Sequence, residues 1–530
     1  MPPHGRDPHR RVNGVRRHTR SFSPPDVSEG FLPSETSSLT IQTHTFFHTQ
    51  RLTVETFIIK ALQLILCFAI LILLHEGGHF FFAKLFGVRV NKFFLFFNPK
   101  FTLFSTYAPW WRKLRGKTPA KKLEDGSYEY EGTEYGIGWL PLGGYCQIAG
   151  MVDETQDSKQ LDKPMQPWEF RAKPAWQRLL IMVGGVLVNF VLAFVIYSAV
   201  LFTWGETYVP IEGMTQGFKF SEQAQQLGFR DGDIVVGTDE KTFVKFNGDV
   251  YRDLSEAHEA KIIRQGKPMT IALPGNLNML EMIKSQPRFI EPLVSSKIKQ
   301  VVAGGAADKA GARSGDRIVA FNGKGLTTVN EYNQIRGTMD DILQSANHAD
   351  SLRLRTATMV IQRAESQQLD TLTLHLDNTY MLGIEWANPV ADGSYKTVTK
   401  HFTLFESIPA GINHGWNVLT GYVDDLKYLF TADGAKSVGS FGAIGSLFPN
   451  QWDWCKFWEL TAFISLMLAF MNILPIPALD GGHVLFLLVE VVTRRKPSDK
   501  FLERAQMVGM ALLLLLMSFA VFNDFRNFLF

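Results

Sequence analysis

The chain has 530 residues, more than a usual single domain, and 46% of them are hydrophobic, with 42 phenylalanines. A mean hydropathy near zero indicates a few membrane spans joined to a large soluble part, not a purely polytopic protein. The net charge of +3 is too small to indicate a nucleic-acid partner, and the scattered Cys67, Cys146 and Cys455 support neither a disulfide framework nor a thiolate metal site.

The first 52 residues show no pattern of a globular domain. They join clustered arginines to proline, serine and threonine without sustained periodicity, a composition typical of disorder. A signal peptide needs an apolar run directly after its basic residues, and none begins before residue 54. We expect a disordered or non-native extension over residues 1–52. A start codon assigned too early is also consistent, since no methionine separates Met1 from Met151.

The motif His-Glu-Gly-Gly-His occupies residues 75–79, inside an apolar run that extends over residues 54–86. Residues four apart share one face of a helix, so His75 and His79 can reach a single metal ion. Glu76 stands beside them, placed to take a proton from water, as in zinc hydrolases. The glycines leave the backbone open to close approach. The alternative is that the motif occurs by chance and that its polar side chains are merely hydrogen-bonded within the fold. This alternative is disfavoured, because ionisable residues are costly in lipid and usually mark function there.

Four apolar runs have the length of membrane spans, and buried helices of a soluble protein are the alternative. Lysines and arginines concentrate between the first two runs and before the last one. The positive-inside rule therefore places both segments in the cytoplasm and residues 205–455 outside, although the basic tail opposes this orientation. The runs cover about residues 54–86, 179–203, 457–474 and 508–522.

The outer segment contains two related stretches. Residues 310–323 read as a short helix, a Gly-Asp turn, a strand and an Asn-Gly turn, an order that resembles a PDZ domain. A weaker copy occupies residues 226–237. We expect a tandem of α+β PDZ domains over residues 205–298 and 299–395. Their grooves could bind peptides by strand addition, or the domains could be spacers or filters.

Residues 396–455 are predicted to hold an amphipathic helix and a membrane-proximal loop. Apolar residues recur at steps of three and four over residues 401–430, with Pro409 as a potential interruption. The helix could lie on the outer membrane surface or brace the second PDZ domain, and a packing role is favoured.

A second polar motif follows the third apolar run. Residues 472–483 read Asn-Ile-Leu-Pro-Ile-Pro-Ala-Leu-Asp-Gly-Gly-His. The prolines and glycines break the helix, and broken backbone at membrane depth is tolerated only where protein encloses it or it lines a wet cavity. A catalytic zinc with two histidine ligands needs one more protein ligand, which Asp480 can supply while leaving a position for water. His483 is the competing candidate, and Asp480 is favoured.

Together these features resemble the site-2 protease family of intramembrane zinc metalloproteases, most of all its bacterial regulator-of-sigma-E protease branch. The resemblance covers the chain from residue 54 onward. It rests on His-Glu-x-x-His in the first span, Asn-x-x-Pro-x-Pro-x-Leu-Asp-Gly-Gly in the third, and PDZ-like segments between the second and third. It implies one Zn²⁺ per chain, with His75, His79 and Asp480 as ligands and Glu76 as general base.

The fold that the resemblance implies is a polytopic α-helical membrane protein with four transmembrane helices. A membrane-associated β-hairpin and the tandem of extracytoplasmic PDZ domains complete it. Residues 53–204 and 456–530 would form the membrane core.

Further positions are implied by the resemblance alone. Asn189 matches the asparagine of the family's Gly-Pro-x-x-Asn motif, which helps to hold substrate, although Val186 stands where the family has proline. Asn472 is similar to a substrate-contacting asparagine. Residues 136–145 resemble the hairpin, whose edge could pair with an unwinding substrate. Helix packing for Asn189 and a membrane anchor for the hairpin are the alternatives. The hairpin residues expected to contact substrate are Gly143, Gly144 and Tyr145.

The implied activity is regulated proteolysis in the bacterial cytoplasmic (inner) membrane. The substrates would be single-pass membrane proteins, such as anti-sigma factors or remnant signal peptides, already trimmed by an upstream site-1 protease. PDZ domains would lie on the periplasmic side and the active site towards the cytoplasm. A PDZ-bearing scaffold with a structural zinc site and a tethered soluble metalloprotease are the alternatives.

Overall fold

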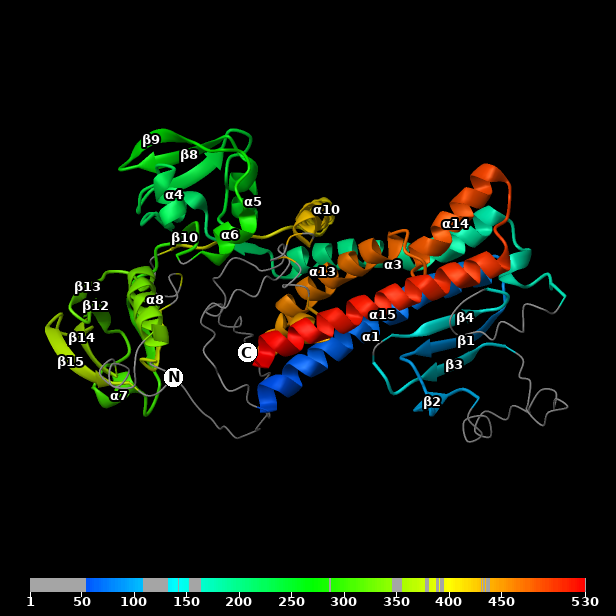
Figure 1. Ribbon diagram of the computed structural model, residues 1–530, viewed down its shortest axis with the longest axis horizontal. Coiled ribbons are helices and arrows are strands. Elements are labelled where there is room, and N and C mark those ends of the chain that lie inside the picture. Colours follow the sequence, from blue (N-terminus) through cyan, green and yellow to red (C-terminus); the bar gives the residue numbers. More distant parts are fainter. Residues whose placement is uncertain are drawn as a thin grey trace, which may run out of the picture. The chain divides into compact units, whose positions relative to one another are not determined.

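The computed structural model describes most of the chain from residue 54 to residue 529 (Figure 1). The predicted extension over residues 1–52 lies outside the described residues. The described residues within 294–327 and 347–394 belong to one compact unit, and the membrane helices belong to another. The described ranges are 54–107, 132–141, 143–151, 164–285, 287–345, 355–376, 381–387, 390, 395–429, 431, 434 and 439–529.

Four of the described helices are long and apolar enough to cross a membrane, which confirms the four predicted spans. The last of them carries large apolar side chains that remain exposed, as expected of a helix that faces lipid. The four are α1 (Val54–Leu85), α3 (Ala175–Thr203), α13 (Trp454–Ile473) and α15 (Asp499–Leu529).

Helix α3 is the centre of the membrane core and packs against α1, α13, α10 (Leu404–Leu429) and α14 (Asp480–Thr493). The backbones of α1 and α3 touch, because a Cβ atom on Gly78 would lie 2.3 Å from the carbonyl oxygen of Gly184. The neighbouring Gly77 has open space around it. The close approach expected from the glycine pair is therefore made by one of its two members.

A four-stranded sheet follows α1 and contacts it, with strand order β2-β3-β1-β4. Strands β3 and β4 flank β1, β3 parallel and β4 antiparallel to it. The prediction of a hairpin over residues 136–145 is therefore wrong, since β1 lies between the two strands. The bounds are β1 (Val90–Leu95), β2 (Phe104–Ser105), β3 (Glu134–Ile137), β4 (Tyr145–Ile148) and a 3-10 turn η2 (Phe170–Ala172).

Helix α10 is continuous through Pro409, so the predicted interruption is absent. One face, which includes Gly411 and Gly415, is buried against α3. Farther along, the buried carboxylate of Asp425 binds Arg252 of α5 (Asp249–Glu256) with an Nη2–Oδ2 distance of 2.9 Å. The helix thus packs on the membrane core and on the domain that contains α5. A short helix, α12 (Phe441–Ser446), then leads to α13.

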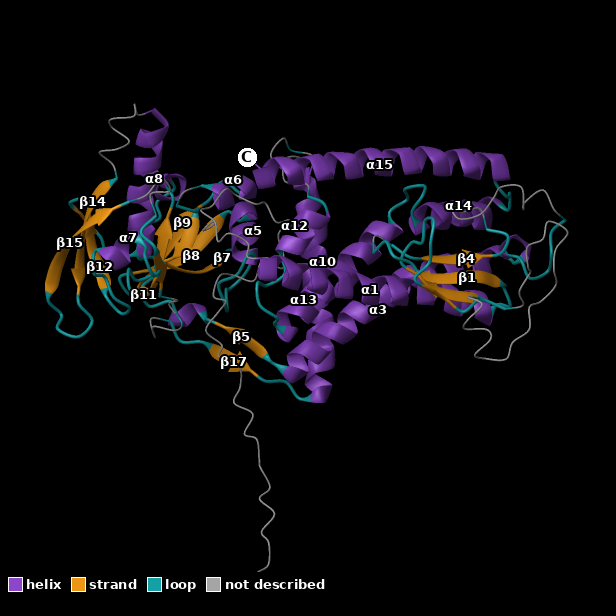
Figure 2. Cartoon of the chain, turned by 90° about the horizontal axis from the view of Figure 1, so that it is seen from below, coloured by secondary structure: helices purple, strands orange, loops and turns teal. Residues whose placement is uncertain are grey.

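The segment between α3 and α10 leaves and re-enters the membrane core side by side. Strand β5 (Glu206–Tyr208), just after α3, pairs antiparallel with β17 (Val398–Lys400), just before α10 (Figure 2). Between them, the first domain of the segment pairs β6 with β10, and β8 lies between β7 and β9 in a second sheet. Its other elements are η3 (Ile211–Gly213), β6 (Phe218–Phe220), α4 (Glu222–Gln226), β7 (Ile234–Thr238), β8 (Glu259–Arg264), β9 (Lys267–Ala272), α6 (Met279–Lys284) and β10 (Ile290–Pro292).

The compact unit that contains most of the second predicted domain has two sheets, β11-β16 and β13-β12-β14-β15. Helix α8 (Val329–Ser345) groups with the larger unit. The elements of the smaller unit are β11 (Ile298–Val301), α7 (Ala306–Lys309), β12 (Arg317–Phe321), β13 (Lys324–Gly325), β14 (Thr356–Gln362), β15 (Leu369–His375) and β16 (Ile384–Trp386).

Candidate metal centre

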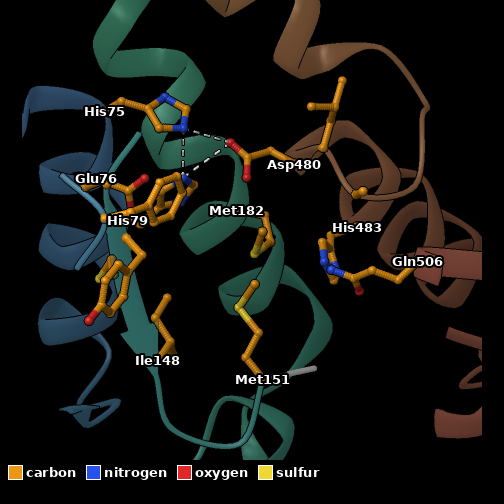
Figure 3. Close-up of a pocket in the computed structure, with 15 residues that line it drawn as sticks. His75, Glu76, His79, Ile148, Met151, Met182, Asp480, His483 and Gln506 are labelled. Atoms are coloured by element: carbon orange, nitrogen blue, oxygen red, sulfur yellow. Dashed lines mark hydrogen bonds and ion pairs between the residues drawn. The ribbon is translucent and has the colours of Figure 1, made fainter. Parts of the chain in front are cut away.

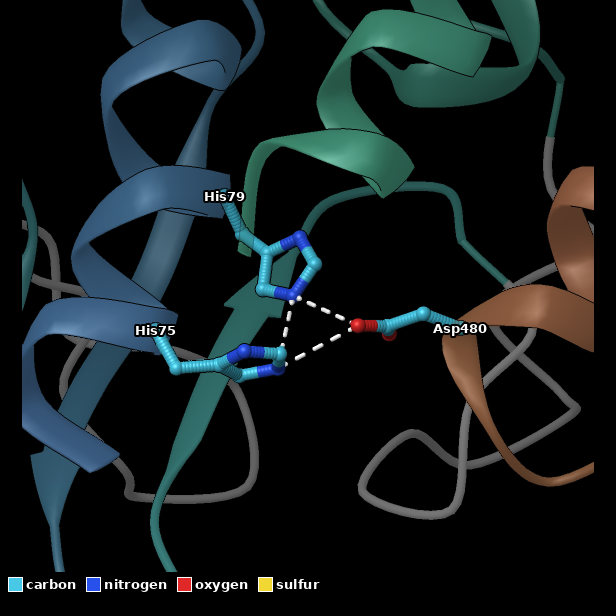
Figure 4. Close-up of side chains that lie close together, drawn as sticks. All are labelled: His75, His79 and Asp480. Atoms are coloured by element: carbon cyan, nitrogen blue, oxygen red, sulfur yellow. Dashed lines mark hydrogen bonds and ion pairs between the residues drawn. The ribbon is translucent and has the colours of Figure 1, made fainter. Parts of the chain in front are cut away.

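Three side chains from opposite ends of the chain meet in the membrane core (Figure 4). His75 and His79 lie one turn apart on α1, and Asp480 is the first residue of α14. The Oδ2 atom of Asp480 lies 3.2 Å from the Nε2 atom of each histidine, and the two Nε2 atoms are 3.3 Å apart. Within the described residues, this group is the one set of His, Cys, Asp or Glu side chains that could hold a metal ion.

The spacing of the three atoms fits zinc. A tetrahedron with such edges has its centre about 2.0 Å from each corner, which is the usual Zn–N and Zn–O distance. Asp480 Oδ2 is also buried and has no hydrogen-bond donor of its own. A buried carboxylate oxygen normally has a hydrogen-bond donor or a metal ion as its partner. The donor set is therefore that of a site with three protein ligands.

A backbone carbonyl orients His79. The Nδ1 atom lies 2.8 Å from the carbonyl oxygen of Ile181 on α3. A carbonyl can only accept, so Nδ1 carries the hydrogen and Nε2 presents a bare lone pair to the other two atoms. Gly185, one turn further along α3, makes room for both rings, because a Cβ atom there would lie 2.5 Å from His79 Nε2.

The second histidine has a different neighbour. Nδ1 of His75 lies 3.3 Å from the amide nitrogen of Asn189 on α3. Asn189 is 1% exposed and is not among the residues that line the pocket described below. The structure therefore brings Asn189 to the predicted site, where it contacts the ring of His75 and does not line the cavity.

Helix α14 is anchored at both of its ends. The connection from α13 turns sharply through Ala478, whose φ of 82° is in the left-handed region. Gly481 and Gly482 pack on this connection, where a Cβ atom would lie 2.1 Å from Leu474 O and 2.7 Å from Ile476 O, respectively. At the far end, Glu490 accepts a 2.5 Å hydrogen bond from Arg178 of α3. These contacts hold the start of α14 opposite α1.

A cavity of about 190 Å³ opens beside the three side chains (Figure 3). Glu76 lines it, and its carboxylate accepts a hydrogen bond from the backbone N–H of Cys146 on β4. Ile148, Met151 and Met182 give the cavity apolar walls. Glu76 therefore faces the space in which a substrate and a water would meet the metal.

The predicted substrate residues divide into two groups. Gly144 and Tyr145 line the cavity, whereas Gly143 and Asn472 are not among its lining residues. Gly143 instead faces Phe97, whose ring would lie 2.5 Å from a Cβ atom there. Tyr145 donates a hydrogen bond to Asn98 Oδ1, and burial raises the pKa of Tyr145 to about 12, so its hydroxyl stays protonated at neutral pH.

His483 lines the same cavity but stands apart from the three converging side chains, next to Gln506 of α15 in Figure 3. The geometry therefore favours Asp480 over His483 as the third ligand. Gln506, Met151 and Met182 were missed by sequence reasoning. No local signal marks them, because two are ordinary apolar side chains and the third is one polar residue on a long helix.

Comparisons with known proteins identify the family of the chain. The model of peptidase family M50 matches residues 63–110 and 122–516. The regulator of sigma-E protease RseP of Escherichia coli (strain K12) is 27% identical over 499 residues, which cover 87% of this chain and 97% of the relative. The RseP of Salmonella typhimurium (strain 14028s / SGSC 2262) is 27% identical over 483 residues, with the same two coverages.

A relative from Vibrio cholerae, named "Putative zinc metalloprotease", is 26% identical over 485 residues and is covered over 97% of its length. The family match, the four apolar helices and a donor set that suits zinc agree with one another. The chain belongs to peptidase family M50, the site-2 protease family, and is a zinc metalloprotease of the membrane.

Proposed function

We propose that this protease cuts single-pass membrane proteins within their transmembrane helices, with His75, His79 and Asp480 as zinc ligands and Glu76 as general base. The observation that carries the proposal is the convergence of three ligand atoms within 4.8 Å of one another, between helices long enough to span a membrane. The cavity beside them leaves space for water and a substrate segment.

The roles of the residues follow from their positions. When bound by these three residues, zinc would supply Lewis acidity, which lowers the pKa of water to about 7 in zinc hydrolases. Glu76, held by the N–H of Cys146, accepts the proton of the attacking water and passes it to the leaving amine. Ile181 and α14 keep the ligands in place, so little rearrangement is needed during the reaction.

The substrate helix must unravel before its carbonyls can be attacked. Unsatisfied backbone groups in hydrocarbon cost several kcal/mol each, so the extended segment needs polar surroundings. Gly144 and Tyr145, at the start of β4, line the cavity, and Gly144 presents only backbone to it. We infer that the unravelled segment lies along this side of the cavity, where Gly144 allows close approach.

The two outer domains are proposed as a PDZ tandem, and a repeated cluster of contacts supports this. In the first domain, Arg264 binds both carboxylate oxygens of the buried Asp233 and also the carbonyl oxygen of Gly228. In the second, Arg363 binds the Oδ2 atom of Asp316 and the carbonyl oxygen of Gly311. In each copy the aspartate also accepts a backbone hydrogen bond from the arginine three residues before it. The weaker upstream copy thus shares the internal contacts of the stronger one.

The wider biology is proposed from the relatives. Those named regulators of sigma-E protease support anti-sigma factors as a substrate class, together with remnant signal peptides. An upstream site-1 protease would remove the outer domain of the substrate, and the PDZ tandem would exclude untrimmed proteins. The basic loops support an inner-membrane orientation with the tandem in the periplasm and the zinc site towards the cytoplasm.

The test is the Glu76→Gln variant, compared with wild type on a transmembrane peptide in detergent. Loss of a general base should lower the cleavage rate by about 100-fold or more, with zinc content unchanged. Undiminished cleavage would refute the assigned base. In cells, the same variant should accumulate membrane-embedded stubs of trimmed proteins. A scaffold with a structural zinc site is not favoured, because such sites normally have four protein ligands.

A further inference from the structure

The side-chain amide of Asn189 has a polar neighbour at its nitrogen and none at its oxygen. Its Nδ2 atom faces Nδ1 of His75 at 3.3 Å, while its Oδ1 atom is buried without a hydrogen-bond partner. The residue is 1% exposed, so solvent does not supply the missing donor. A buried acceptor without a donor is costly and calls for a physical explanation.

Metal binding decides which end of the amide should meet the ring. If His75 gives its Nε2 lone pair to a metal, a neutral imidazole must carry its hydrogen on Nδ1. Two donors would then face each other, the ring N–H and the amide nitrogen. A half-turn of the amide about its terminal bond puts Oδ1 in the same place without changing the shape of the side chain. That arrangement pairs Oδ1 with the ring hydrogen and removes the clash of two donors, while Nδ2 takes the place that Oδ1 occupies now.

We infer that Asn189 is a positioning residue whose Oδ1 atom accepts the Nδ1–H of His75 and fixes the tautomer that presents Nε2 to zinc. The inference rests on the proposed function, in which His75 is a zinc ligand. Each histidine then has its own acceptor on α3, a backbone carbonyl for His79 and a side-chain carbonyl for His75. This role replaces the substrate contact that the family resemblance implies for Asn189.

The surroundings of Asn189 suit a fixed position. Ser465 of α13 is fully buried and donates a 2.8 Å hydrogen bond to the backbone carbonyl oxygen of Asn189. One turn earlier, Gly185 lets α3 approach the rings, because a Cβ atom there would lie 2.9 Å from Nδ1 of His75. A single turn of α3 therefore provides both the space for the ring and its acceptor.

The experiment measures the zinc dissociation constant of the purified full-length protein in detergent, by competition with a chromogenic chelator. Asn189→Leu removes the acceptor and should weaken zinc binding by about 10- to 100-fold. Asn189→Asp keeps the shape but can only accept, so it should bind zinc at least as tightly as wild type. Gln63→Leu is the matched control, because it also removes a buried side-chain amide. Gln63 lies on α1 about three turns before His75, so this variant should leave zinc affinity unchanged.

The outcomes separate the alternatives. Wild-type zinc affinity in Asn189→Leu would overturn the inference, as would an Asn189→Asp variant that binds zinc as weakly as Asn189→Leu. If Asn189→Leu does not fold, Asn189→Asp still decides. If the amide nitrogen of Asn189 donated to His75, the Asp variant would lose that donor and should bind zinc more weakly than wild type. A raised KM in both variants with unchanged zinc affinity would assign Asn189 to the substrate. Full zinc affinity in His75→Ala would instead refute the proposed function itself.

Discussion

The contact between α1 and α3 at Gly78 gives the sharpest structural prediction. In a Gly78→Ala variant the new Cβ atom would lie 2.3 Å from the carbonyl oxygen of Gly184 and 2.6 Å from its carbon, whereas ordinary contact begins at 3.4 Å. Both neighbours are backbone atoms, so no side chain can rotate away. The helices must separate locally by about 1 Å, at an overpacking cost of about 1–3 kcal/mol.

The metal centre should respond more strongly than the fold. Ligand distances tolerate deviations of about 0.2 Å, and His79 directly follows Gly78 in the chain. A shift of α1 relative to α3 moves His79 away from the carbonyl of Ile181, now 2.8 Å away. We expect zinc affinity to fall by about tenfold or more, as for the loss of a contact that orients a ligand.

The assay is zinc affinity by chelator competition together with thermal unfolding in detergent. Gly77→Ala is the control, because nothing lies within 4 Å of a Cβ atom there. Alanine in an open helix position stabilises by about 0.5–1 kcal/mol, so this variant should keep its zinc affinity and unfold no earlier than wild type. Equal zinc loss in both variants would point to backbone flexibility instead of packing. Unchanged zinc affinity in Gly78→Ala would refute the reasoning.

Three further outcomes are expected. Gly185→Ala places a Cβ atom within 2.5–2.9 Å of both imidazoles and should lose zinc while the protein still folds, which metal analysis and size-exclusion chromatography check. Arg252→Ala leaves the 1% exposed Asp425 unpaired and should destabilise by about 3–5 kcal/mol in thermal unfolding, whereas Lys427→Ala, which breaks an exposed pair with Glu256, should cost at most about 1 kcal/mol. A chelator should abolish peptide cleavage, and added zinc should restore it; cleavage that persists in metal-free protein would contradict the assigned enzyme class.

The four spans and the three candidate zinc ligands could be predicted from the sequence, because each leaves a local signal. The helical period places His75 and His79 on one face, and an aspartate at a break between apolar stretches needs a partner. The two motifs can form one metal site only if these distant segments of the chain lie side by side, and the structure brings them together.

Other features depend on which segments become neighbours, and no local pattern encodes that. The stretch 136–145 reads as a hairpin, yet β1 inserts between its two strands through a parallel pairing with β3. Asn189 resembles a substrate-binding residue by motif, but the crossing of α1 over α3 turns it towards His75. Met182 reads as one more apolar residue of a span until the fold exposes it to the cavity.

The most direct measurement of the central claim is the zinc content of purified Asp480→Ala and His483→Ala proteins, compared with wild type. The account predicts one zinc per chain in wild type and in His483→Ala, and strong loss of zinc in Asp480→Ala. Full zinc content in Asp480→Ala, or loss confined to His483→Ala, would contradict it.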